Sequence, residues 1–167
     1  RQLSLPVANS WDQVSQQLGR EHLSYLSLEN FCLPLQELMQ LRPLLGLRSP
    51  VNTLSRMLNP LRATSSLQSI FHPAYARLHQ QADLLLDQPR ALVFKGESGE
   101  VEVKPHADTR LSLLLDRQLR EMVIPRCLIQ RVDSVDSPSV EPLRSMWRGS
   151  TSNDYGLSAT LATTAAA

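Results

Sequence analysis

The chain has 167 residues, which is enough for one domain with a buried core and too few for two. Its apolar fraction of 42% and charged fraction of 20% are ordinary for a globular protein, and they exclude a largely disordered chain. The 17 basic and 16 acidic residues leave a net charge of +1, which excludes a strong overall attraction to nucleic acid or membranes.

The beginning of the chain predicts a helix followed by a strand. Ser10 and Gln13 are spaced as a capping box, which predicts a helix to about Leu18, and Gly19 is expected to end it. Partial alternation of apolar and polar residues over 22–28 predicts a strand.

Two further helices are predicted next. Apolar residues at roughly helical spacing indicate one over 32–41. Ser49 followed by Pro50 is typical of a helix start, because proline at the first helical position loses no hydrogen bond. The helix over 51–58 should then stop before the Asn-Pro pair at 59–60.

The middle of the chain reads as strand, helix, strand. Residues 65–71 form a candidate strand, 73–86 a helix, and 90–94 a short apolar run typical of a buried parallel strand. The apolar residues near one face of that helix are Ala76, Leu78, Ala82 and Leu85.

The remaining segments predict short strands and then two helices. The strands are expected at 101–103, 109–115 and 119–123, and the helices from 137 to 147 and from Asn153 onward. Strands alternating with helices predict an α/β fold, part of a mostly parallel sheet with flanking helices. We expect residues 1–167 to form a single incomplete domain of a larger protein, since both ends of the chain look cut.

Cysteine and apolar content bear on the cellular compartment. Cys32 and Cys127 lie far apart and form no CxxC pair, so a disulfide framework or zinc knuckle is not expected and the thiols should be reduced. No apolar run approaches the ~20 residues of a membrane helix. We therefore expect a cytoplasmic protein without a membrane partner.

Residues 45–54 (LGLRSPVNTL) and the LNP at 58–60 resemble the anthranilate phosphoribosyltransferase family, glycosyl transferase family 3. There a "GxRTxFNxxGPLxNP" stretch lies close to the acceptor pocket. The His-Pro pair at 72–73 matches that family's "HP", and 90–99 is similar to its "ALVVHGxxG" strand and turn. The pattern of 142–167 is similar to its two closing helices. The resemblance implies a C-terminal α/β domain of the nucleoside phosphorylase/phosphoribosyltransferase type.

The resemblance implies three acceptor-binding residues. Arg42 stands where the family has an arginine that contacts the acceptor's carboxylate, which suits a guanidinium fork. The alternative is a solvated cation near a helix C-terminus. Arg48 is either an anion ligand or, as we favour, a pin that binds carbonyls of the turn. Asn52 is expected to satisfy backbone groups of its helix.

Two departures from the family pattern concern chemistry. Cys32 stands where family enzymes carry a histidine, which puts acceptor choice or activity in question. The adjacent Asp-Glu pair that holds Mg²⁺ in the family is Val101-Glu102 here. Glu102 would keep part of the magnesium role, with Glu100 as a substitute partner. The alternative is a surface charge on a strand, where alternation would send 101 and 102 to opposite faces.

The family's glycine-rich donor loop and small helical domain should precede this chain, so the chain alone is expected to be inactive. The full-length parent, expected to be a homodimer, would transfer a phosphoribosyl group from phosphoribosyl pyrophosphate to an anionic aromatic acceptor. No catalytic residue is assigned.

The alternative is a non-catalytic, nucleic-acid-binding paralogue on the same scaffold. Its basic residues would be Arg110, Arg117, Arg120, Arg126 and Arg131. Acidic residues are interleaved with them, a mixture more typical of a solvated face. A third possibility is a structural half-domain with no retained function.

Overall fold

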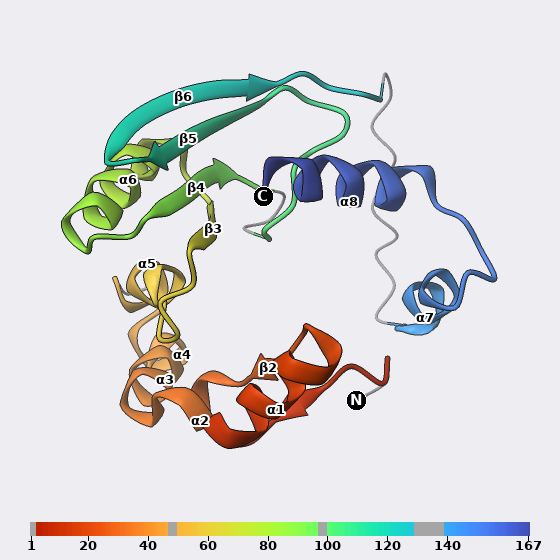
Figure 1. Ribbon diagram of the computed structural model, residues 1–167, viewed down its shortest axis with the longest axis horizontal. Helices are drawn as coiled ribbons and strands as arrows, with labels where there is room; N and C mark the ends of the chain where they lie inside the picture. The colour runs from red at the N-terminus through yellow and green to blue at the C-terminus, as the bar shows by residue number, and fades with distance from the viewer. Residues whose placement is uncertain (1–2, 47–49, 97–99, 129–138) are drawn as a thin grey trace. The chain divides into compact units, whose positions relative to one another are not determined.

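The computed structural model describes residues 3–46, 50–96, 100–128 and 139–167 (Figure 1). It divides into two compact units, the first from 1–55 and 136–151 and the second from 56–135 and 152–167. In these described ranges, no helix has both the length and the apolar character needed to cross a membrane. The expectation of a single domain over 1–167 stays a prediction.

The first unit is built from short helices and one pair of two-residue strands. Its elements are β1 (Val7–Ala8), α1 (Trp11–Glu21), β2 (Tyr25–Leu26), α2 (Leu28–Phe31), α3 (Leu33–Gln40), α4 (Arg42–Leu45), α5 (Val51–Leu54) and α7 (Glu141–Trp147). The strands β1 and β2 pair in parallel. The helix predicted over 32–41 is confirmed as α3, and the helix predicted over 51–58 is found as α5 followed by a 3₁₀ turn.

Helix α1 begins as predicted and ends later than predicted. Ser10 Oγ accepts a hydrogen bond from the backbone N–H of Gln13 at 3.3 Å, as a capping side chain does. The predicted end at Gly19 is wrong, because glycine is tolerated inside a helix at a modest cost and the next turn still forms. The helix ends instead at Glu21, and the left-handed φ of 56° at the capping residue His22 turns the chain away.

The second unit holds the main sheet. Its elements are β3 (Ser65–Ile70), the 3₁₀ helix η2 (Pro73–Tyr75), α6 (Ala76–Leu85), β4 (Arg90–Lys95), β5 (Thr109–Leu115), β6 (Gln118–Ile124) and α8 (Asp154–Ala166). A further 3₁₀ helix, η1 (Ser55–Met57), precedes them. The strand order is β3-β4-β5-β6 (Figure 1). The α/β class, with a sheet flanked by helices, is confirmed.

Pairing within this sheet is mixed. Strands β3 and β4 are parallel and are connected through α6, which is a β-α-β crossover. Strands β4 and β5 are antiparallel, and so are β5 and β6. The antiparallel pairing of β5 and β6 follows from Asp116 and Arg117, whose positive φ angles of 49° and 60° make a two-residue hairpin turn. The parallel character expected for the sheet thus holds at β3–β4.

The two faces of the sheet are covered by different helices. Side chains alternate along a strand, so Leu67 and Gln68 of β3 point to opposite faces. Leu67 packs against the same hydrophobic cluster as Ala162 and Ala166 of α8. Gln68 instead contacts α6. The centre of the α8-side core consists of Leu92, Phe94, Val103 and Leu111.

The buried face of α6 is polar, which corrects the predicted apolar face. Leu78 is 53% exposed and Leu85 is 83% exposed. The buried residues are His79, Gln80 and Asp83. Each has a hydrogen-bond partner on the sheet: Gln68 Nε2 donates to Asp83 Oδ1 at 2.8 Å, and Gln68 Oε1 lies 2.8 Å from His79 Nδ1. Gln80 Nε2 donates to the backbone carbonyls of Leu113 and Arg120.

The predicted strand over 101–103 is wrong. Strands β4 and β5 each already have a partner on both sides, so neither leaves a free edge for this segment. The backbone N–H of Val103 donates instead to Thr163 Oγ1 of α8 at 2.9 Å. The segment therefore crosses the end of the sheet as an irregular connection, with Val103 buried and Val101 exposed.

Candidate functional site

The predicted acceptor-binding residues fall in the first unit or outside the described residues. Arg42 is exposed and is the first residue of α4, one position after Leu41, which caps the C-terminus of α3. Asn52 lies half-buried in α5. Arg48 lies outside the described residues. The turn from Arg42 closes at Gly46, whose backbone N–H donates to the Arg42 carbonyl at 3.0 Å and whose φ is 66°.

Cys32 lies at the junction of α2 and α3. Its thiol is free and half-buried, and the exposed Cys127 is free too. The backbone N–H of Cys32 donates to the Leu28 carbonyl at 2.7 Å and closes the last turn of α2.

The predicted metal residue, Glu102, belongs to the second unit and is held by α8. Tyr155, in the first turn of that helix, donates its hydroxyl to Glu102 Oε1. The ring of His106 lies 6.0 Å from the ring of Tyr155. His106 Nδ1 is buried, and no hydrogen-bond partner for it is found in the described part of the chain. These three side chains form a compact polar cluster beside the sheet.

This cluster offers one carboxylate to a metal ion. Among the described residues no group of three or more His, Cys, Asp or Glu side chains is arranged to hold a metal. Magnesium is nevertheless often bound through only one or two carboxylates, with the rest of its shell coming from water and substrate phosphates. A lone carboxylate such as that of Glu102 is compatible with Mg²⁺ only where water and a phosphate ligand supply the rest of the shell.

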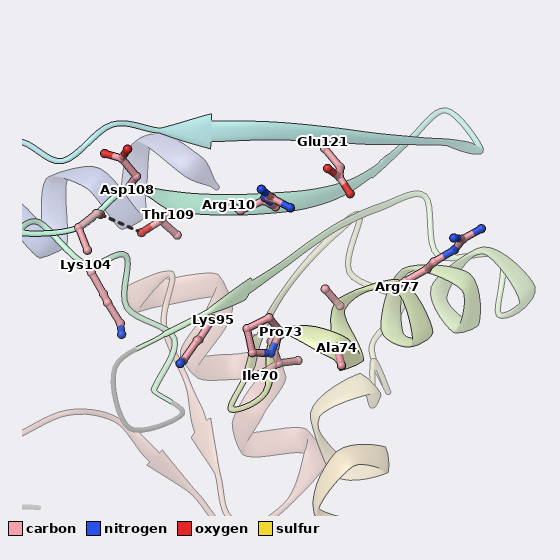
Figure 2. Close-up of a pocket in the computed structure, with 12 residues that line it drawn as sticks. Ile70, Pro73, Ala74, Arg77, Lys95, Lys104, Asp108, Thr109, Arg110 and Glu121 are labelled. Atoms are coloured by element: carbon pink, nitrogen blue, oxygen red, sulfur yellow. Dashed lines mark hydrogen bonds between the residues drawn. The ribbon is translucent and has the colours of Figure 1, made fainter.

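A pocket of about 520 Å³ lies on the α6 side of the sheet (Figure 2). Its charged lining residues are Arg77, Lys95, Lys104, Asp108, Arg110 and Glu121. Ile70, Pro73 and Ala74 form part of its apolar lining. Four cations against two carboxylates make the lining positive, which favours an anionic ligand.

The pocket is placed by the register of the sheet. Ile70 and Lys95 are the last residues of the parallel strands β3 and β4 and are paired with each other. Open α/β sheets commonly bind ligands outside the carboxyl ends of parallel strands. Arg110 enters from β5, Arg77 from α6 and Lys104 from the connection before β5. Residues from several segments that are distant in sequence therefore surround one opening.

Sequence reasoning did not find most of this pocket. The predicted basic stripe contributes only Arg110 to it, since Arg117 pairs with Asp87 and Arg120 donates to Gln118 Oε1 at 2.7 Å. Arg126 does not line the pocket, and Arg131 lies outside the described residues. The available signal was Lys95 at the end of a buried strand, a position that places a side chain at the sheet's carboxyl edge.

Comparison with known proteins gives a consistent answer. Residues 1–164 match the family described as "Glycosyl transferase family, a/b domain". An anthranilate phosphoribosyltransferase of Oleidesulfovibrio alaskensis is 32% identical over 124 residues, 73% of this chain and 37% of that protein. One from Nitrosomonas eutropha is 25% identical over 113 residues, 68% of this chain and 33% of that protein.

A third relative has no function in its name. An "Uncharacterized protein" of Aquifex aeolicus is 33% identical over 98 residues, 58% of this chain and 32% of that protein. The chain thus spans about a third of the length of the curated relatives it matches.

Proposed function

Since this chain belongs to the glycosyl transferase family with the a/b domain, we propose that the whole protein is a phosphoribosyltransferase. Its donor would be phosphoribosyl pyrophosphate and its acceptor an anionic aromatic compound. The observation that supports this most strongly is the similarity to anthranilate phosphoribosyltransferases over more than two thirds of the chain. We also propose that the whole protein is a homodimer and is located in the cytoplasm.

The proposed reaction breaks the bond between the anomeric carbon and pyrophosphate and forms one from that carbon to the acceptor. Pyrophosphate leaves with the bonding electron pair. Positive charge develops at the anomeric carbon, so positioning and electrostatic stabilisation would supply the catalysis, without a nucleophile from the protein. For this reason the proposal names binding residues and no catalytic residue.

Glu102 is the proposed magnesium ligand. When bound, Mg²⁺ would neutralise the charge of the pyrophosphate leaving group. The chain's own contribution is to hold the carboxylate still, because the hydroxyl of Tyr155 fixes Oε1 from α8. A hydrogen bond from outside the metal shell that orients a ligand is a common feature of metal sites.

Arg42 is the proposed acceptor residue, with Arg48 and Asn52 beside it in sequence. Its exposed guanidinium at the start of α4 is accessible to a carboxylate.

The test is pyrophosphate release by the intact protein, with phosphoribosyl pyrophosphate, Mg²⁺ and a panel of aromatic carboxylic acids. We expect turnover with at least one acid and a KM for it that rises about tenfold or more in Arg42→Gln.

Arg20→Gln is the matched control, because Arg20 is an exposed arginine in the last turn of α1. It should leave the KM unchanged. Absence of pyrophosphate release with every acid would contradict the proposed transfer. An equal rise of KM in both variants would contradict the role of Arg42.

Nucleic-acid binding is the second candidate, and the observation that favours it is the positive lining of the pocket beside β4. Binding of a polynucleotide should weaken steeply as salt rises, because phosphate contacts release counterions. Fluorescence anisotropy with a labelled single strand, from 50 to 200 mM salt, measures this. No binding at 50 mM salt would remove the candidate.

A further inference from the structure

We propose that a second pocket, at the amino ends of β3 and β4, binds a small zwitterion, namely an α-amino acid with an apolar side chain. The ammonium group of the ligand would bind Asp83, and its carboxylate would bind Arg62. We call this site the Asp83 pocket. The proposal goes beyond the transfer reaction, since it uses neither Glu102 nor the acceptor residues.

The Asp83 pocket lies at the opposite end of the parallel strands from the positive pocket of Figure 2. Its lining residue Pro89 directly precedes β4, and its lining residue Arg62 lies shortly before β3. The register pairs Ser65 with Arg90, so both strands begin at this edge of the sheet. All of its lining residues belong to the second unit. The pocket is therefore a separate site within one compact part of the chain.

A carboxylate oxygen without a partner carries the proposal. Asp83 lines the pocket from α6, and only 1% of its surface is exposed. Its Oδ1 accepts the hydrogen bond from Gln68, whereas no hydrogen-bond partner for its buried Oδ2 is found in the described part of the chain. A buried, ionised oxygen without a partner is costly, so this position favours a ligand that brings a donor and a positive charge. Burial raises the pKa of Asp83 for the same reason.

Arg62 supplies a positive charge to the same pocket, and its side chain is exposed. Asp87 lines the pocket too, but its charge is offset by an ion pair with Arg117. One buried carboxylate and one exposed guanidinium then remain, and these match the ammonium group and the carboxylate of a zwitterion. A simple cation would satisfy only Asp83, and a simple anion would satisfy only Arg62.

The rest of the lining suits an apolar side chain held in a fixed frame. The volume of the pocket, about 590 Å³, lies within the range of small-molecule sites. Leu58 and Leu86 are 42% and 65% exposed, so a ligand could cover apolar surface that now faces water. Asn59 Nδ2 donates to Gln88 Oε1 at 2.7 Å, which fixes two polar lining residues against each other. A frame that is already ordered lowers the entropic cost of binding.

The test is calorimetric titration of the intact protein with L-leucine, L-methionine and L-phenylalanine. We expect at least one of them to bind. The tightest binder is then compared with the amine that lacks its carboxylate and with the acid that lacks its amino group; for leucine these are isoamylamine and isocaproate. The amine should bind about tenfold more weakly, because it loses the contact with Arg62. The acid should not bind, because it leaves Asp83 Oδ2 without a partner.

Two substitutions separate the two charges. Asp83→Asn keeps the shape of the side chain and an acceptor for Gln68, but it removes the second acceptor oxygen and the charge. Binding of the amino acid should weaken about tenfold or more. Arg62→Gln should weaken binding of the amino acid about tenfold and leave the affinity for the amine unchanged. Loss of folding cannot produce that difference between two ligands.

Arg77→Gln is the matched control, because Arg77 is an exposed arginine of α6 that does not line the Asp83 pocket. It should leave the affinity for each ligand unchanged. Absence of binding by all three amino acids overturns the proposal. So does binding of the acid analogue as tight as that of the amino acid, or a loss of affinity in Arg77→Gln equal to that in Arg62→Gln.

Discussion

At the scale of single residues, the hydrogen-bonded trio Gln68, His79 and Asp83 is the most unusual feature of the second unit. All three side chains are buried. Because Gln68 Oε1 only accepts, His79 Nδ1 carries the proton between them. Burial lowers the pKa of His79, and the charge of Arg56 adds to this effect. Burial raises the pKa of Asp83, against an opposing hydrogen bond from Gln68.

The trio predicts how stability depends on pH. The unfolded chain protonates His79 near its ordinary pKa of about 6.5, whereas the folded protein resists protonation to lower pH. The histidine's contribution to the free energy of unfolding should therefore be complete above about pH 7.5 and fall as pH drops below 6.5. Urea unfolding at pH 7.5 and 5.5 should show a smaller decrease in His79→Gln than in the unaltered protein.

The control for that experiment is His22→Asn, since His22 is exposed and asparagine tolerates its left-handed φ of 56°. This variant should keep the decrease between the two pH values. An unchanged decrease in His79→Gln would show that the buried histidine does not cause it.

Tyr155 gives a second prediction at this scale. Tyr155→Phe removes the hydroxyl that donates to Glu102 Oε1, so the carboxylate loses a fixed orientation. The Mg²⁺ concentration that gives half-maximal donor binding should rise about tenfold. Tyr75→Phe, at an exposed tyrosine in η2, should leave it unchanged. The same Mg²⁺ dependence in Tyr155→Phe and the unaltered protein would refute the positioning role of the hydroxyl.

At the scale of elements, the close packing of the turn after β4 fixes the start of the connection to β5. Gly96 directly follows Lys95 and precedes the connection that carries Glu102 and Lys104. A Cβ added at Gly96 would lie 1.7 Å from the carbonyl oxygen of Glu100 and 2.8 Å from Ser69 Oγ. The backbone itself would have to move, so this close approach requires glycine.

Gly96→Ala should therefore destabilise the protein by about 1–3 kcal/mol, the usual cost of overpacking. Gly19→Ala is the matched control, because nothing lies within 4 Å of the added Cβ and the residue is inside α1. It should stabilise the protein by about 0.5–1 kcal/mol. Chemical denaturation measures both, and equal stability of Gly96→Ala and the unaltered protein would contradict the packing at this turn.

Local patterns predicted those elements that local forces determine. Apolar alternation placed β5 at 109–115, as found, and the capping residue placed the start of α1. The buried face of α6 was missed because Gln68, eleven residues before His79, supplies the hydrogen bonds that make polar burial acceptable. The prediction of a strand at 101–103 was wrong because strand formation depends on a free partner edge, which the sequence does not display.

At the scale of the whole molecule, the proposed roles are divided between the two units. Arg42 and Asn52 belong to the first, and Glu102 and the Asp83 pocket to the second. The sequence predicted the family and the α/β class because ordered motifs run through the whole chain. It did not predict the pocket at the carboxyl ends of β3 and β4, since Arg77 of α6 and Arg110 of β5 are distant in sequence and are brought to one opening by the packing of the helix on the sheet.

The measurement that tests the central proposal most directly is calorimetric titration of the intact protein with phosphoribosyl pyrophosphate, with and without Mg²⁺. We predict binding that requires Mg²⁺ and that weakens about tenfold in Glu102→Gln. Glu21→Gln, an exposed glutamate at the end of α1, should bind as the unaltered protein does. No binding in either condition, or binding that is indifferent to both Mg²⁺ and Glu102→Gln, would contradict the account.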